Sequence, residues 1–202
     1  MPENDPVRIE AYRVELERRK DAVRDFAAGL PTWPDQKVVW EVGCGHGHFL
    51  NAYAEAHPDQ LCIGIDLVGE RVERSAKKKD RNQLPNLHFL RSEARLFLSQ
   101  WPAERPFSRV FILFPDPWPK ARHHKHRILQ PEFLSALAGR CQPRAALHFR
   151  TDYRPYFDDA HQTLSAHSRW EVVAEPWPFE YETVFQQRAT SYDSVIARRR
   201  PH

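Results

Sequence analysis

The sequence predicts an α/β fold in which helices cover both faces of a seven-stranded, mostly parallel sheet that ends in an antiparallel strand. Two observations support this prediction. From residue 38 onward, short apolar runs alternate with amphipathic stretches, which is the pattern of successive strand–helix–strand units. No long amphipathic stretch separates the last two apolar runs, which indicates an antiparallel pair. A sheet of this kind is Rossmann-like.

The expected elements follow one another with short connections. Apolar runs predict strands at residues 38–42, 61–65, 87–90, 110–114, 146–149, 170–173 and 195–197. Amphipathic stretches predict helices at residues 49–56, 68–83, 94–101, 132–140 and 153–166.

The N-terminal part has a different pattern from the rest. Residues 1–28 are rich in charge and predict a helix, with Tyr12 and Val23 near one face. Two prolines then break the chain before the first strand. We therefore expect an N-terminal helical extension, 1–36, and one α/β domain, 37–202.

Composition limits the class of protein. The chain has 202 residues, of which 41% are hydrophobic, enough for one sizeable core. No apolar run approaches the length of a membrane span, and the charged N-terminus has no signal-peptide stretch, so we expect no membrane contact. Three widely separated cysteines without CxxC spacing predict a reduced, cytoplasmic protein without disulfides or zinc. The net charge of +3 permits a nucleic-acid partner without requiring one.

A glycine-rich turn follows the first expected strand. It has the pattern Glu41-x-Gly43-x-Gly45-x-Gly47, and glycines there let the backbone approach a ligand closely. A dinucleotide site is the alternative, but its fingerprint has glycine where this chain has His48. Glu41 would repel a pyrophosphate, whereas it suits the cationic amino end of a methionine. The turn therefore favours S-adenosylmethionine as the cofactor.

Two further carboxylates follow the next strands. Asp66 ends the second strand, where a carboxylate can accept both ribose hydroxyls of a nucleoside, a role common to both cofactors. Glu93 follows the third strand and could accept from the adenine amino group, although a carboxylate there is also an ordinary partner of a helix N-terminus.

A proline-rich loop, residues 114–120, follows the fourth strand beside the expected cofactor site. It contains Asp116 and ends at Lys120. Adenine-modifying methyltransferases carry an Asp-Pro-Pro-Tyr type of loop at this place, and the order Pro-Asp-Pro-Trp here indicates a different target atom. Loops at the carboxyl ends of strands carry the chemistry of α/β proteins.

Basic residues and a carboxylate complete the expected substrate side. Arg122, Lys125 and Arg127 form a patch that can neutralise phosphates. Three histidines lie among them, but no nearby carboxylate or cysteine completes a metal site, so we expect no metal. Asp152 follows the fifth strand, where it can accept hydrogen bonds from the Watson–Crick edge of guanine or cap the next helix.

Together these motifs resemble those of the tRNA (guanine-N7-)-methyltransferase family of class I methyltransferases. The resemblance runs from about Val38 to Arg199. It rests on the glycine turn, the Gly-Ile-Asp sequence ending at Asp66, the loop Phe-Pro-Asp-Pro-Trp-Pro-Lys with its basic run, the Thr-Asp pair at Asp152, and the segment 183–188. It implies methyl transfer from S-adenosylmethionine to N7 of a tRNA guanine, usually that at position 46 of the variable loop.

The resemblance also implies residue roles. The cofactor side comprises Glu41, Gly43, Gly45, Asp66, Glu93 and Asp116. The residues that would contact the tRNA guanine are Lys120, Asp152, Thr183 and Gln186. The family usually has glutamate where Asp66 and Gln186 stand; at position 186 glutamine keeps an acceptor oxygen but loses the charge.

The expected chemistry is mostly positioning. N7 of guanine has an in-plane lone pair and no proton, so no general base is needed before attack on the sulfonium methyl group. Either Asp116 or Asp152 could stabilise the positive charge that develops on the purine. The alternatives are a methyltransferase for another substrate class, a non-catalytic tRNA-binding protein and, less favoured, an NAD-dependent oxidoreductase. The compact chain resembles stand-alone bacterial enzymes, which implies no obligatory protein partner.

Overall fold

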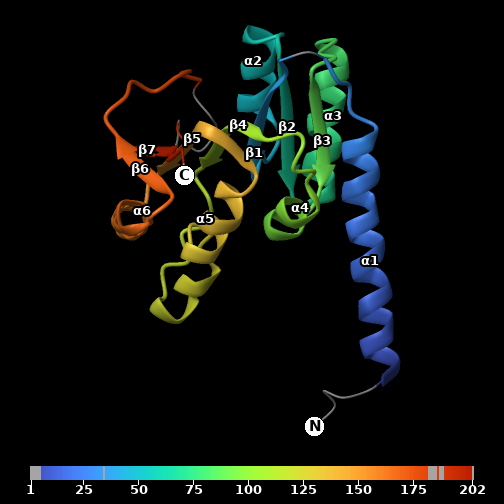
Figure 1. Cartoon of the computed structure of the whole chain (residues 1–202), viewed down its shortest axis with the longest axis horizontal. Helices are drawn as coiled ribbons and strands as arrows, with labels where there is room; N and C mark the ends of the chain where they lie inside the picture. Colours follow the sequence, from blue (N-terminus) through green and yellow to red (C-terminus); the bar gives the residue numbers. More distant parts are fainter. Residues whose placement is uncertain (1–5, 34, 182–185, 187–188, 202) are drawn as a thin grey trace.

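The computed structural model describes residues 6–33, 35–181, 186 and 189–201, and its centre is a seven-stranded sheet (Figure 1). The strand order is β3-β2-β1-β4-β5-β7-β6. Strands β1 to β5 pair in parallel, whereas β7 lies between β5 and β6 and is antiparallel to both. The predicted Rossmann-like sheet with a final antiparallel strand is confirmed.

Each predicted element is present, with bounds that differ by a few residues. The strands are β1 (Lys37–Val42), β2 (Gln60–Asp66), β3 (Leu87–Arg91), β4 (Phe107–Leu113), β5 (Cys141–Thr151), β6 (Trp170–Val173) and β7 (Asp193–Arg199). The helices are α1 (Pro6–Ala28), α2 (His48–Ala56), α3 (Gly69–Arg81), α4 (Ala94–Gln100), α5 (Pro131–Ala138) and α6 (Arg154–Ala166). A short 3-10 helix, η1 (Ala121–His126), was not predicted; it contains most of the basic run.

The sheet is buried on both faces, as parallel sheets require. Val38 and Trp40 of β1 point into the larger core with side chains of α1, α4, α5 and α6, whereas Val39 points into a second core with α2. The Trp40 ring stacks on Phe107 with centroids 5.1 Å apart. These two hydrophobic cores hold the strands in place, and with them the strand ends from which the loops of the site begin.

Helix α1 packs on the domain with its C-terminal half only. Val23 is buried and α1 contacts α4, whereas Tyr12, predicted near the same face, is 67% exposed. Figure 1 shows the N-terminal end of α1 projecting beyond the rest of the molecule. Its charged side chains pair along the helix instead, as Arg18 does with Glu15 at 2.8 Å. Such exposed pairs contribute little stability.

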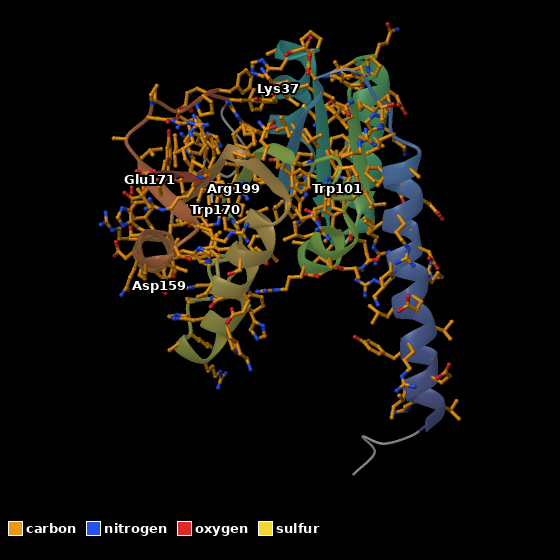
Figure 2. All side chains as sticks on the ribbon, in the orientation of Figure 1. Lys37, Trp101, Asp159, Trp170, Glu171 and Arg199 are labelled. Carbon is orange, nitrogen blue, oxygen red and sulfur yellow. The ribbon has the colours of Figure 1, made fainter. Side chains whose placement is uncertain are left out.

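The C-terminal basic run is held by the sheet. Trp170 of β6 lies opposite Arg199 of β7, and both are labelled in Figure 2. The Trp170 ring is buried, and its indole N–H donates to the Leu134 carbonyl at 3.0 Å. Arg199 donates to the carbonyl of Ala138 at 2.8 Å. Arg199 therefore holds β7 against the end of α5.

In the described part of the chain, no helix is both long enough and apolar enough to cross a membrane. Cys44, Cys62 and Cys141 are buried, and none forms a disulfide.

Candidate cofactor and substrate site

A cavity of about 460 Å³ opens at the carboxyl ends of β1, β2 and β4. Five of the six residues predicted for the cofactor side line it: Glu41, Gly43, Gly45, Asp66 and Asp116. They lie at, or just after, the carboxyl ends of β1, β2 and β4, which the parallel sheet brings to the same edge. Ligands of open α/β sheets bind at this edge.

The glycine turn has the backbone conformation that its sequence requires. Gly43, Gly45 and Gly47 have φ of 72°, 54° and 65°, a region that side chains rarely adopt. A Cβ atom on Gly43 or Gly45 would meet nothing within 4 Å, so both glycines leave space beside the cavity. At Gly47 it would lie 2.8 Å from the Phe89 ring and from the Ser75 hydroxyl, so Gly47 is needed for packing.

Asp66 holds the turn as well as facing the cavity. One carboxylate oxygen accepts from the Gly45 N–H and the other from the Val68 N–H, both at 2.9 Å. From α3, Ser75 donates to the Gly45 carbonyl at 3.2 Å and Lys78 to that of His46 at 3.0 Å. A carboxylate has lone pairs left for ribose hydroxyls after two such bonds. The sequence did not indicate this structural role.

Glu41 is a buried carboxyl group at the edge of the cavity. It is 4% exposed, and its Oε2 atom has no hydrogen-bond partner among the described residues. Burial raises the pKa of Glu41 to about 8, and the nearby charge of Asp66 contributes. A buried carboxyl that lacks a partner favours a cationic ligand. The primary ammonium of S-adenosylmethionine fits this requirement.

Glu93 lies outside this cavity. Its Oε2 accepts from the Leu96 N–H at 2.8 Å, so Glu93 caps α4. It lines a neighbouring hollow of about 440 Å³ with Arg18 and Arg19 of α1, and Leu67 lines both spaces. Contact between Glu93 and adenine would require the base to extend past Leu67, and that role stays a prediction.

The loop after β4 is bound to the neighbouring strand. Phe114 and Trp118 have positive φ, 47° and 45°, which is uncommon for side chains of this size. The Phe114 N–H donates to the Arg150 carbonyl at 2.7 Å, which fixes where the loop begins. Asp116 and Lys120 are exposed, and Asp116 lines the cavity. Strained backbone of this kind is common at functional sites.

The predicted phosphate contacts separate into two groups. Arg122 and Lys125 on η1 are exposed and can reach a phosphate. Arg127 is 2% exposed, and the prediction that it contacts tRNA is wrong for this structure because no surface is left for a phosphate. It donates to the Pro117 carbonyl at 2.9 Å and pairs with Asp159 of α6, labelled in Figure 2. Arg127 therefore braces the base of the loop.

Asp152 is exposed at the end of β5. It does not cap the next helix: the residue at the N-cap is Tyr153, whose N–H donates to the Thr151 hydroxyl at 3.2 Å. The alternative role as a helix cap is therefore wrong, and the carboxylate is available to a ligand. Thr183 lies outside the described residues. Gln186 donates from its amide to the Tyr192 hydroxyl at 2.9 Å.

One group of side chains beside the site has no signal in the sequence. Arg150, directly before the Thr-Asp pair, is buried between the rings of Trp177 and Tyr192 and pairs with Glu180. The sequence around Arg150 does not indicate these contacts, because the partner residues lie some 30 to 40 positions later in the chain.

The strand order, the glycine turn and the buried carboxyl group at the cavity together define a class I methyltransferase, the class of fold that uses S-adenosylmethionine. Solved structures agree on the fold. An rRNA methylase from Streptococcus thermophilus is similar with a TM-score of 0.58 at 12% identity, over 88% of this chain and 93% of that one. A precorrin-6y C5,15-methyltransferase from Geobacter metallireducens has a TM-score of 0.57 at 14% identity, over 90% and 87%.

Residues 35–199 match the family described as "Putative methyltransferase", and the chain belongs to this family. Its curated relatives are named tRNA (guanine-N(7)-)-methyltransferase. The protein of Nitrosomonas europaea is 32% identical over 163 residues, which cover 78% of this chain and 72% of the relative. The protein of Streptomyces coelicolor is 36% identical over 134 residues, 66% of this chain, and the chain spans about half, 49%, of that relative's length.

Proposed function

We propose that this protein transfers the methyl group of S-adenosylmethionine to N7 of a guanine in tRNA. The observation that carries the proposal is the placement of Asp116 and Asp152. They follow β4 and β5, whose pairing with each other ends at Leu113 and Arg150, so both exposed carboxylates lie at the carboxyl ends of adjacent strands. Asp116 also lines the cavity that suits the cofactor. The names of the curated relatives support the same reaction.

The bound cofactor supplies an electrophilic methyl group on a sulfonium. The N7 lone pair of guanine forms the new C–N bond, the C–S bond breaks, and sulfur keeps the electron pair. The chain's own task is to hold the purine in line with that bond. Asp152 would accept from the guanine N1–H and amino group, whose acidity rises as N7 becomes alkylated. Asp116, at the cavity, would stabilise the positive charge that develops on the ring.

The exposed cations of η1 and Lys120 would bind phosphates on either side of the target base. We also propose that the target is the guanine of the variable loop, that the protein needs no obligatory partner protein, and that it works in the cytoplasm, where tRNA is abundant.

The first experiment is nucleoside mass spectrometry of tRNA lacking 7-methylguanosine after incubation with the protein and S-adenosylmethionine. Appearance of 7-methylguanosine supports the proposal; cofactor binding without product contradicts it.

The role of Asp152 has a matched control on α6. We expect Asp152→Asn to lower kcat/KM for tRNA on the order of 100-fold, because the base loses a charged acceptor in the transition state. The dissociation constant of S-adenosylmethionine should stay unchanged. Asp158→Asn alters an exposed carboxylate that pairs with Arg154, and should leave both quantities unchanged. Equal losses of turnover and cofactor affinity in Asp152→Asn would contradict the assigned role.

A further inference from the structure

The Arg150 side chain has a single, closely defined orientation. It is 5% exposed, and its guanidinium carbon lies 4.0 Å from the centroid of the Trp177 ring and 4.6 Å from that of Tyr192. Its two terminal nitrogens each donate to one oxygen of Glu180 at 3.0 Å, and Nε donates to the Ser194 hydroxyl at 2.9 Å. A planar group with two ring contacts and a bidentate carboxylate is held far more firmly than a surface pair.

Two of the four partners of Arg150, Tyr192 and Glu180, also interact with Gln186. The Gln186 amide donates to the Tyr192 hydroxyl at 2.9 Å. The pKa of Glu180 is held below its usual value, mainly by its hydrogen bond with Arg150, and a hydrogen bond with Gln186 also lowers it. Gln186 is therefore connected to Arg150 through the Tyr192 hydroxyl, and it also contributes to the lowered pKa of Glu180, the carboxylate that Arg150 holds.

The backbone of Arg150 connects to the other substrate-facing loops. Its carbonyl accepts from the Phe114 N–H, which begins the loop that contains Asp116. Asp152 follows two positions later on the same strand end. One residue thus joins three segments that are distant in the chain: the loop after β4, the turn after β5, and the segment between β6 and β7.

We propose that Arg150 is a positioning residue that fixes Gln186 for the tRNA guanine through Glu180 and Tyr192. The inference rests on the proposed function and extends it to a residue with no assigned role. The uncharged amide at position 186 also suits this arrangement. An amide can donate to both the Tyr192 hydroxyl and the Glu180 carboxylate, whereas a second carboxylate would repel Glu180.

The first test uses two glutamates on the same C-terminal segment. Glu180 is 60% exposed and pairs with Arg150; Glu175 pairs with Arg198 at 3.1 Å and does not belong to this cluster. We expect Glu180→Gln to lower kcat/KM for tRNA by about tenfold or more, because a small misplacement of a substrate contact is costly. Glu175→Gln should leave it within twofold of the wild type. Equal effects of the two variants would overturn the proposal.

A second test distinguishes positioning from general stability. In Arg150→Lys, the charge remains but the bidentate contact is lost, so KM for tRNA or kcat should change while the dissociation constant of S-adenosylmethionine does not. Gln186→Glu should lower the rate when Glu180 is present, and adding Glu180→Gln to that variant should raise it again. A Gln186→Glu variant as active as the wild type would refute the charge argument.

Failure of the proposed function and failure of the positioning inference give different experimental results. If the wild-type protein binds S-adenosylmethionine but methylates no tRNA, the reaction assignment fails. Amide hydrogen exchange of residues 174–181 then decides the positioning inference. Exchange that is at least tenfold faster in Glu180→Gln than in Glu175→Gln supports a fixed segment; equal exchange in both variants overturns it.

Discussion

Binding of S-adenosylmethionine should depend on pH through Glu41. In the free protein, burial raises the pKa of this carboxyl to about 8, so Glu41 is neutral at pH 6. An ammonium ligand requires the ionised form, and binding below pH 8 must therefore remove a proton from Glu41. The affinity should rise as the pH rises toward 8, where the carboxyl becomes charged, and fall above it, where the amino group of the ligand loses its proton.

The size of the effect follows from the same pKa. Between pH 6 and 7.5 the ionised fraction of a group with pKa 8 rises roughly 24-fold. The amino group of the ligand, with a pKa near 7.8, loses about a third of its charge over this range, which reduces the expected gain in affinity to roughly 15-fold. Replacement of Glu41 by glutamine removes the titrating group and should remove this slope.

Isothermal titration calorimetry can count the released proton directly. At pH 6.5, titrations in two buffers of different ionisation enthalpy should show release of about one proton for each cofactor bound. Glu41→Gln should release none and bind more weakly. Glu70→Gln, which alters an exposed glutamate that pairs with Arg74, should keep both the slope and the proton release of the wild type. A wild-type affinity that is constant from pH 6 to 7.5, with no proton released, would refute the reasoning.

Three further substitutions test other parts of the site. Gly47→Ala adds a methyl group 2.8 Å from the Phe89 ring at a φ of 65°, so urea unfolding should show a loss of about 1–3 kcal/mol and cofactor affinity should fall; an unchanged midpoint would contradict this packing. Arg127→Met removes a buried cation that braces the loop, so the protein should lose roughly 2–4 kcal/mol on denaturation. Because the buried Arg127 side chain leaves no surface for a phosphate, its variant should keep the salt dependence of tRNA binding; a shallower slope would restore the phosphate role. Lys125→Met should make that slope shallower by about one while stability stays constant.

The sheet could be predicted from the sequence because its signals are local. Apart from Glu41, runs such as 38–42 and 61–65 contain no charged or polar side chain, which is typical of strands buried on both faces. The glycine turn and Asp66 were also predictable, since their spacing along the chain fixes their spacing at the sheet edge. The pattern of apolar residues did not predict that β7 lies between β5 and β6. That order depends on pairing between segments that are distant in the chain.

Individual side chains were harder to predict than elements. The sequence groups Arg127 with Arg122 and Lys125 because all three are cations within one run. Only their burial in the folded chain separates them: Arg127 is buried and supports the loop, whereas Arg122 and Lys125 are exposed and can reach a phosphate. Arg150 gave no signal because its partners Trp177 and Glu180 come from a segment with no regular pattern. An ion pair between positions 30 residues apart, such as Arg150 and Glu180, has no counterpart in the local sequence.

The placement of β7 also affects how the chain folds during synthesis. Among the described strands, β6 pairs with β7 alone, and β7 supplies the antiparallel partner of β5. During synthesis, β6 therefore has no strand partner until residues 193–199 have left the ribosome. A chain that stops before Asp193 lacks β7 and therefore leaves β5 and β6 with unpaired edges; Asp152 directly follows β5. Emergence of residues 193–199 therefore completes the sheet beside Asp152, and a product interrupted before them presents unpaired edges that protein quality control can recognise.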